Sequence, residues 1–287
     1  MTVVLALIAS ALFGTGVALQ QRPAAAVPRE YAARPGLLLR VVRNPVWVVG
    51  VVAEIAAFVT QLIALRRGSL LVVQPLLTTS LLFTFALGSW WARQPTSARD
   101  WLSVGCVAAG LAAFLAVASP SEDSEGAAPA GEWVLWGASI AAALALLIWI
   151  GLRSEGRHRA ASLGLAAGLG DAFMAVLTKA FAHATNQGIG SAFTTWIPYA
   201  LCVAGIGAML LTQTAYQTGQ PKIAIPLITV TEPLVSCGIG VGLFGEAIHV
   251  GGLRAPVVVA SVAVMVSGLV SLSRSSVVEP SESVVTH

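Results

Sequence analysis

The chain has 287 residues, of which 56% are hydrophobic and only 10% are charged, and its formal net charge is +3. Soluble globular proteins carry about 25% charged residues, so this chain lacks the polar side chains that would cover a soluble domain of its size. Apolar runs close to about 20 residues, the length that crosses a bilayer as a helix, recur from end to end. The composition therefore excludes a soluble globular protein and predicts an all-α, polytopic integral membrane protein.

We expect about nine transmembrane helices, at residues 3–20, 46–65, 69–91, 101–118, 133–152, 161–181, 196–216, 223–244 and 253–272. The first run could be mistaken for a signal peptide. No positive charge precedes it, however, and a long basic loop follows it, so we expect a retained helix. A first half (1–118) and a second half (133–273) are joined by an acidic linker (119–132), and the polar tail (274–287) is expected to be disordered.

The distribution of basic residues predicts the orientation in the membrane. The loop at residues 21–44 alone contains five arginines, and loops rich in Lys and Arg stay on the cytoplasmic side. With nine spans, this places the N-terminus outside the cell and the C-terminus in the cytoplasm. We expect the protein to lie in the plasma membrane.

Two stretches about 150 residues apart share one pattern, TQLIALRRGSLLVVQP in the first half and TQTAYQTGQPKIAIP in the second. The second, third and fourth spans therefore correspond to the seventh, eighth and ninth. An offset of five spans is odd, so matched helices cross the membrane in opposite directions. Such inverted repeats are typical of secondary transporters, whose substrate site lies near the midplane. The matched positions are Thr60, Gln61, Gly68 and Pro75 in the first half and Thr212, Gln213, Gly219 and Pro226 in the second.

Three carboxylates fall within predicted spans, at Glu54, Asp171 and Glu232. Ionisable groups are expensive inside a bilayer and usually serve a function there. We expect all three to bind a proton or a cation at a site near the midplane. Polar residues on the same helices, and prolines that free backbone carbonyls, complete the predicted substrate or ion pathway: Gln61, Gln74, Thr178, Gln213, Pro75, Pro226 and Pro233.

Several of these residues have a structural alternative. Each carboxyl could instead be a protonated clasp between helices. Lys179 is expected to extend to the headgroups, with an ion pair to a carboxylate as the alternative. Glu246, at a helix end, fits an anchor or cap better than a ligand. The three cysteines and four histidines have no metal-ligand spacing, so the sequence leaves a metal site undetermined.

The closing stretch LFGEAIHVGGLRAPVVVASVAVMVSGLV resembles the end of an EamA-type half in the drug/metabolite transporter superfamily. The stretch WVVGVVAEIAAFVTQLIALRRGSLLVVQPL is similar to the NIPA-type branch, with Trp47, Glu54 and Phe58 in the matching places. The resemblance implies two inverted-repeat halves and transport of a small solute, or of magnesium if the NIPA-like features dominate. The Gly-Glu motif at the helix end occurs in the second half only, and the first half has Gly88-Ser89 at the corresponding position.

We therefore expect a secondary transporter of a metabolite or drug-like compound that works by alternating access, coupled to a proton or a cation. A magnesium or divalent-cation transporter is one alternative, because hard cations prefer oxygen ligands. A membrane scaffold or lipid-handling protein without a solute pathway is the other. We expect no enzymatic activity, no cofactor and no nucleic-acid partner. The bilayer and a small-molecule or cation substrate are the expected partners, and the sequence leaves a homodimer open.

Overall fold

A computed structural model describes residues 1–25, 43–92, 97–118, 129–216, 218, 220–246 and 254–273. These residues form helices and connecting turns without a strand, so the described chain is all-α. In chain order the helices are α1 (Thr2–Ala25), α3 (Pro45–Leu65), α4 (Leu70–Leu77), α5 (Ser80–Ala92), α6 (Ala98–Ala118), α7 (Ala130–Arg153), α8 (Gly156–Ala184), η2 (Thr185–Gln187), α9 (Ile189–Ala192), α10 (Ile197–Tyr216), α11 (Pro221–Phe244) and α12 (Arg254–Ser273).

Eight stretches of the described chain are long and apolar enough to cross a membrane, with α4 and α5 forming one of them together. The remaining long helix, α10, has 20 residues, and its apolar part Ile197–Thr212 is shorter. The predicted multi-pass membrane class is therefore confirmed. The first helix continues to Ala25, beyond the predicted end at residue 20.

The third span is not the single helix that the sequence predicted, because it breaks at Thr78 and Thr79 into α4 and α5. Pro75 lies inside α4, where its missing N–H affects the turn before it and not the break after Leu77. The hydroxyl of Thr78 donates to the Pro75 carbonyl at 2.7 Å, and that of Thr79 donates to the Leu76 carbonyl at 2.7 Å. Every residue of α4 is buried. The protein thus carries a half-helix in its interior.

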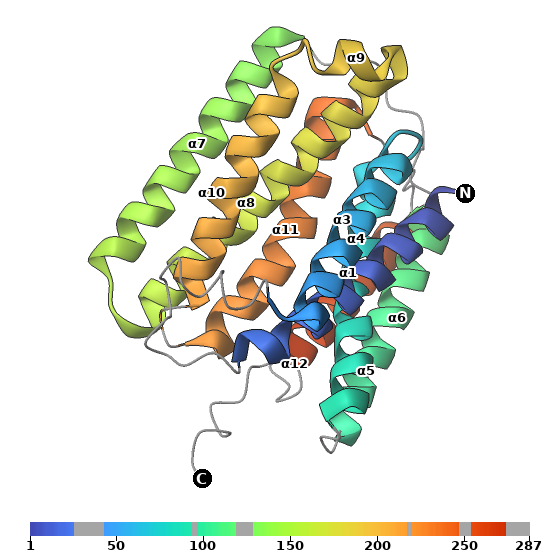
Figure 1. Ribbon diagram of the computed structural model, residues 1–287, viewed down its shortest axis with the longest axis vertical. Helices are drawn as coiled ribbons and strands as arrows, with labels where there is room; N and C mark the ends of the chain where they lie inside the picture. Colours follow the sequence, from blue (N-terminus) through green and yellow to red (C-terminus); the bar gives the residue numbers. More distant parts are fainter. Residues whose placement is uncertain are drawn as a thin grey trace.

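Close helix contacts depend on glycine, as is usual in membrane bundles. A Cβ on Gly164 would lie 3.1 Å from the Ala224 carbonyl oxygen, and one on Gly168 would lie 2.7 Å from Thr231 Cβ. Both pairs join α8 to α11, and both partners advance along the chain together, so these two helices run parallel. In Figure 1, α7, α8, α10 and α11 lie together on one side, and α1 lies with α3, α4, α5 and α6 on the other.

Several sequence predictions fall outside the described residues. These are most of the basic loop (26–42), most of the acidic linker (119–128), Gly219, the tail (274–287) and the side chain of Gln213. The inverted repeat and the division into halves stay predictions. The matched helices differ in one respect, because α11 continues through Pro226 and Pro233, whereas its counterpart is broken into α4 and α5.

Candidate functional site

Two of the three predicted carboxylates meet where α8, α10 and α11 pack together. The Thr212 hydroxyl on α10 lies near the Asp171 carboxyl group on α8. Its charge also acts on Glu232 of α11, so the two carboxyl groups are neighbours. The helices approach closely here because Gly168 faces α11 and Gly170 faces Ala208 of α10. We call Asp171 and Glu232 the carboxylate pair.

The chemistry of such a pair follows from its depth in the bundle. Two like charges that act on one another within membrane-spanning helices disfavour one another, and both side chains are only partly exposed. A shared proton or a bound cation relieves this repulsion. The hydroxyl of Thr212 supplies one further oxygen at the same place. The arrangement can therefore take up and release a proton or a monovalent cation.

The third predicted carboxylate has different neighbours. Glu54 on α3 packs against α1, where a Cβ on Gly16 would lie 2.6 Å from Glu54 Cγ. Its carboxyl group faces the side-chain amide of Gln20, also on α1. These contacts place Glu54 at the α1–α3 interface, and none of the described contacts joins it to the carboxylate pair. The expected convergence of three acids is thus seen for two of them.

The remaining predicted pathway residues are mostly buried within helices. Gln61 is buried, two turns beyond Glu54 on α3. Gln74 is buried in the half-helix α4, and within the described chain its Nε2 has no hydrogen-bond partner. The buried Thr178 hydroxyl donates to the Met174 carbonyl of its own helix at 2.8 Å. Its described hydrogen bond therefore stays within α8.

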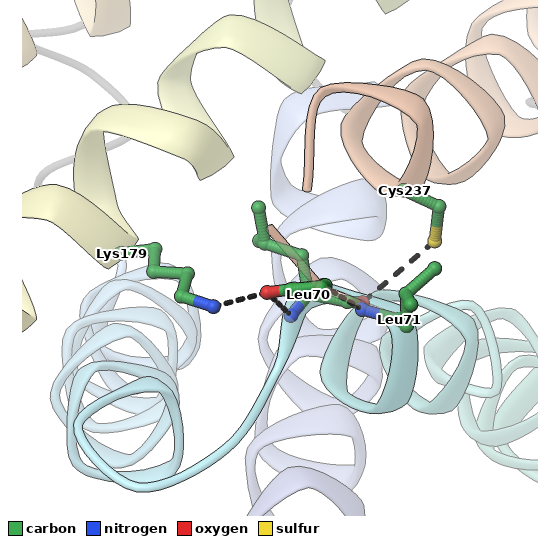
Figure 2. Close-up of polar contacts among 5 residues, drawn as sticks. Leu70, Leu71, Lys179 and Cys237 are labelled. Carbon is green, nitrogen blue, oxygen red and sulfur yellow. Dashed lines mark hydrogen bonds and ion pairs between the residues drawn. The ribbon is translucent and has the colours of Figure 1, made fainter. Parts of the chain in front are cut away.

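A buried ion pair closes one end of this bundle. The ammonium of Lys179 on α8 donates to Oε1 of Glu246, which follows α11, and neither side chain has exposed area. The same carboxylate accepts the backbone N–H of Leu70 at 2.7 Å and that of Leu71 at 3.0 Å (Figure 2). Glu246 thereby satisfies two free N–H groups at the start of α4, as an N-cap does. We call Lys179, Glu246 and the start of α4 the closed end.

The backbone after α11 explains how Glu246 reaches this position. Gly245 adopts a left-handed conformation with φ of 64°, which glycine tolerates best. The turn brings the Glu246 N–H to the Gly240 carbonyl at 3.2 Å. A Cβ on Gly240 would lie only 2.7 Å from Glu246 Oε2. The Phe244 ring lies beneath Lys179, with Nζ 4.7 Å from the ring centroid. The Gly-Glu motif therefore builds the closed end.

These contacts correct one sequence prediction and refine another. Lys179 does not extend to the headgroups but forms the ion pair that was its alternative. A buried lysine ammonium is stabilised by a hydrogen-bonded carboxylate, which offsets part of the cost of removing its charge from water. Glu246 is a cap, as predicted, but it caps a helix 176 residues away in the sequence. No local pattern could have identified that partner.

The opposite end of the same two helices contains a cavity of about 530 Å³. It lies between the first turns of α8 and α11 and the last turns of α12, and we call it the α8–α12 cavity. Because an α-helix rises about 1.5 Å per residue, Asp171 lies about 15 Å along α8 beyond Ala161 and about 12 Å before Lys179, whereas on α11 the lining residue Val230 precedes Glu232 by only two residues. The residues that line it are Arg157, His158, Ala161, Ile223, Pro226, Leu227, Val230 and Val270.

The described residues contain no group of three or more His, Cys, Asp or Glu side chains that could hold a metal ion. The fold and the site together define an all-α, multi-pass membrane protein with a carboxylate pair between its helices. This chain is 27% identical to an uncharacterised protein of Corynebacterium glutamicum over 285 residues, which cover 96% of each chain. No family model matches the chain, and no solved structure matches it.

Proposed function

We propose that this protein is a secondary transporter of a small solute, a metabolite or a drug-like compound. The observation that carries the proposal is the carboxylate pair of Asp171 and Glu232, which three membrane helices bring together. Two ionised carboxyl groups inside membrane helices are costly unless one of them is protonated or a cation is bound beside them. Reversible binding of that proton or cation is what a coupled transporter requires.

The positions of the closed end and the cavity favour alternating access. A buried ion pair between Lys179 and Glu246 joins α8 to the end of α11 on one side, while a cavity lies beside the other end of the same helices. Thr2 packs against Gly68 beside the closed end. If the N-terminus lies outside the cell, the closed end faces the extracellular side of the plasma membrane and the cavity faces the cytoplasm. Transport would then break the ion pair and fill the cavity.

The resemblance to the drug/metabolite transporter superfamily supports the same proposal. The magnesium alternative has less support, since Mg²⁺ prefers octahedral coordination by oxygen and, among the described residues, two carboxyl groups and one hydroxyl are near one another here. A scaffold or lipid-handling protein would need the carboxylates only as clasps. Replacing each acid by its amide separates these roles, because an amide keeps hydrogen bonds but cannot titrate.

The test is uptake into vesicles reconstituted with the full-length protein, screened over small solutes with and without a pH gradient. We expect Asp171→Asn and Glu232→Gln each to lower coupled uptake at least tenfold while the proteins still insert and fold. Glu132→Gln is the matched control, because Glu132 is an exposed carboxylate at the start of α7. Transport by both pair variants with an unchanged response to the gradient would contradict the carrier role.

A further inference from the structure

The α8–α12 cavity has a chemical character that neither the carboxylate pair nor the closed end explains. Six of its lining residues are apolar and come from α8, α11 and α12. The other two, Arg157 and His158, are adjacent basic residues in the first turn of α8. None of the described residues that line the cavity is acidic. The cavity is thus apolar along most of its wall and basic at one edge.

We propose that the α8–α12 cavity binds an amphiphilic anion, a single carboxylate or phosphate group joined to an apolar chain. The guanidinium of Arg157 can bind such a headgroup through two parallel hydrogen bonds, and His158 adds a second donor. The N–H groups at the start of α8 have no side-chain cap and also favour a negative charge, and an anion bound there shares this helix start with the exposed carboxylate of the N-cap residue Glu155. A volume of about 530 Å³ falls in the range of small-molecule sites.

The apolar part of the ligand is expected to lie along α11. Ile223, Pro226, Leu227 and Val230 recur every three or four residues and therefore share one face of that helix. Val270 covers the cavity from α12. A linear chain along this face leads from the basic edge toward the level of Glu232. Burial of a chain gains about 0.8 kcal/mol per methylene, so both the charge and the chain are needed for tight binding.

The proposed binding of an amphiphilic anion does not depend on the transporter proposal. Only the statement that this anion is the transported substrate rests on the proposed function. Binding itself can be measured without transport. The two claims therefore fail separately. Lack of binding would overturn the ligand class, whereas binding without uptake into vesicles under any gradient would overturn the transporter proposal and leave the site intact.

The test uses radiolabelled decanoate and the full-length protein in nanodiscs of zwitterionic lipid. We expect saturable binding of decanoate, competition by decyl phosphate, and at least tenfold weaker competition by decanol and by acetate. Arg157→Gln is expected to weaken decanoate binding at least tenfold. Arg159→Gln is the matched control, because Arg159 is exposed in the same turn region but does not line the cavity. Leu227→Trp, which fills the apolar wall, should weaken both decanoate and decanol.

A second arm distinguishes a membrane lipid from a free solute as the source of the anion. Nanodiscs that contain anionic phospholipid should lower decanoate binding if a lipid headgroup occupies the cavity, and should leave it unchanged if the ligand is a free anion. Either result supports the proposed chemistry. Equal competition by decanoate and decanol, or equal binding by the Arg157→Gln and Arg159→Gln variants, would overturn it.

Discussion

The two ends of the α8–α11 pair are stabilised by different kinds of interaction. The closed end is held by a buried ion pair, two backbone hydrogen bonds to Glu246 and a cation over the Phe244 ring. At the cavity end α8 and α11 stay in close contact through Gly164 and Ala224, and the cavity of about 530 Å³ lies beside this contact, between the two helices and Val270 of α12. Bonds that are directional and buried hold one end shut, while weak apolar packing at the other end can be rearranged.

This difference indicates where a conformational change would meet resistance. Because α8 and α11 are parallel and contribute to both ends, a tilt of one against the other opens one end as it narrows the other. The interactions at the closed end must be lost for that tilt, and the apolar wall of the cavity must come together. The carboxylate pair lies between them, so its occupancy can bias the tilt.

The largest effect is expected from breaking the buried ion pair. Lys179→Met leaves the Glu246 carboxylate buried without its cation, and Glu246→Gln leaves a buried ammonium without its anion. Losing one partner of a buried pair costs about 3–5 kcal/mol, so both variants should unfold more readily in a detergent titration. The double variant should lose less stability than the sum of the two, because neither charge remains unpaired.

Arg66→Gln provides the control for this cycle. Arg66 lies near the same end, but its bond to Asn186 at 3.0 Å is exposed, and exposed pairs contribute roughly 0–1 kcal/mol. If the ion-pair variants proved as mild as Arg66→Gln, the closed end would not be held by the contacts described above. Strict additivity of the two single variants would contradict direct pairing.

A smaller effect is expected from crowding the closed end instead of removing a charge. Gly240→Ala would place a methyl group 2.7 Å from Glu246 Oε2, and overpacking typically costs about 1–3 kcal/mol. Gly238→Ala is the matched control on the same helix, because a Cβ there meets no atom within 4 Å. We expect Gly240→Ala to raise labelling of a cysteine placed at Leu70, and Gly238→Ala to leave it unchanged. Equal labelling of the two would contradict the tight fit.

The sequence predicted the all-α membrane fold and most helix positions because long apolar runs have few alternatives in a bilayer. It also drew attention to Asp171 and Glu232, because a carboxylate inside an apolar run is costly, but their role stays a prediction. It did not predict the break in the third span. The break lies at Thr78 and Thr79, whose hydroxyls bond carbonyls three residues back, and Thr79 also meets the Ser10 hydroxyl of α1 at 2.7 Å, a distant partner that the sequence does not indicate.

The pairing of Lys179 with Glu246 was beyond sequence reasoning for a different reason. The partners are 67 residues apart, and the carboxylate also binds a helix start 176 residues away. Local periodicity indicates which residues share one face of a helix, but it does not indicate which distant residues contact that face. The signal that was available is chemical: a lysine within an apolar span requires a carboxylate, and the Gly-Glu close supplied one on a turn.

The smallest effect is expected at Glu54, which tests whether the first half contains a second ion site. Its described contacts are with α1, through Gly16 and Gln20, and not with the carboxylate pair. Glu54→Gln keeps the size of the side chain, and the described Gln20 Nε2 makes no hydrogen bond to it, so we expect stability to change by less than about 1.5 kcal/mol, the net value of one hydrogen bond. Coupled uptake in vesicles should fall far less than in Asp171→Asn. An equal loss of coupling in both variants would mean that Glu54 joins the pair in another conformation, so that the convergence of three acids expected from the sequence occurs during the transport cycle and not in the state described.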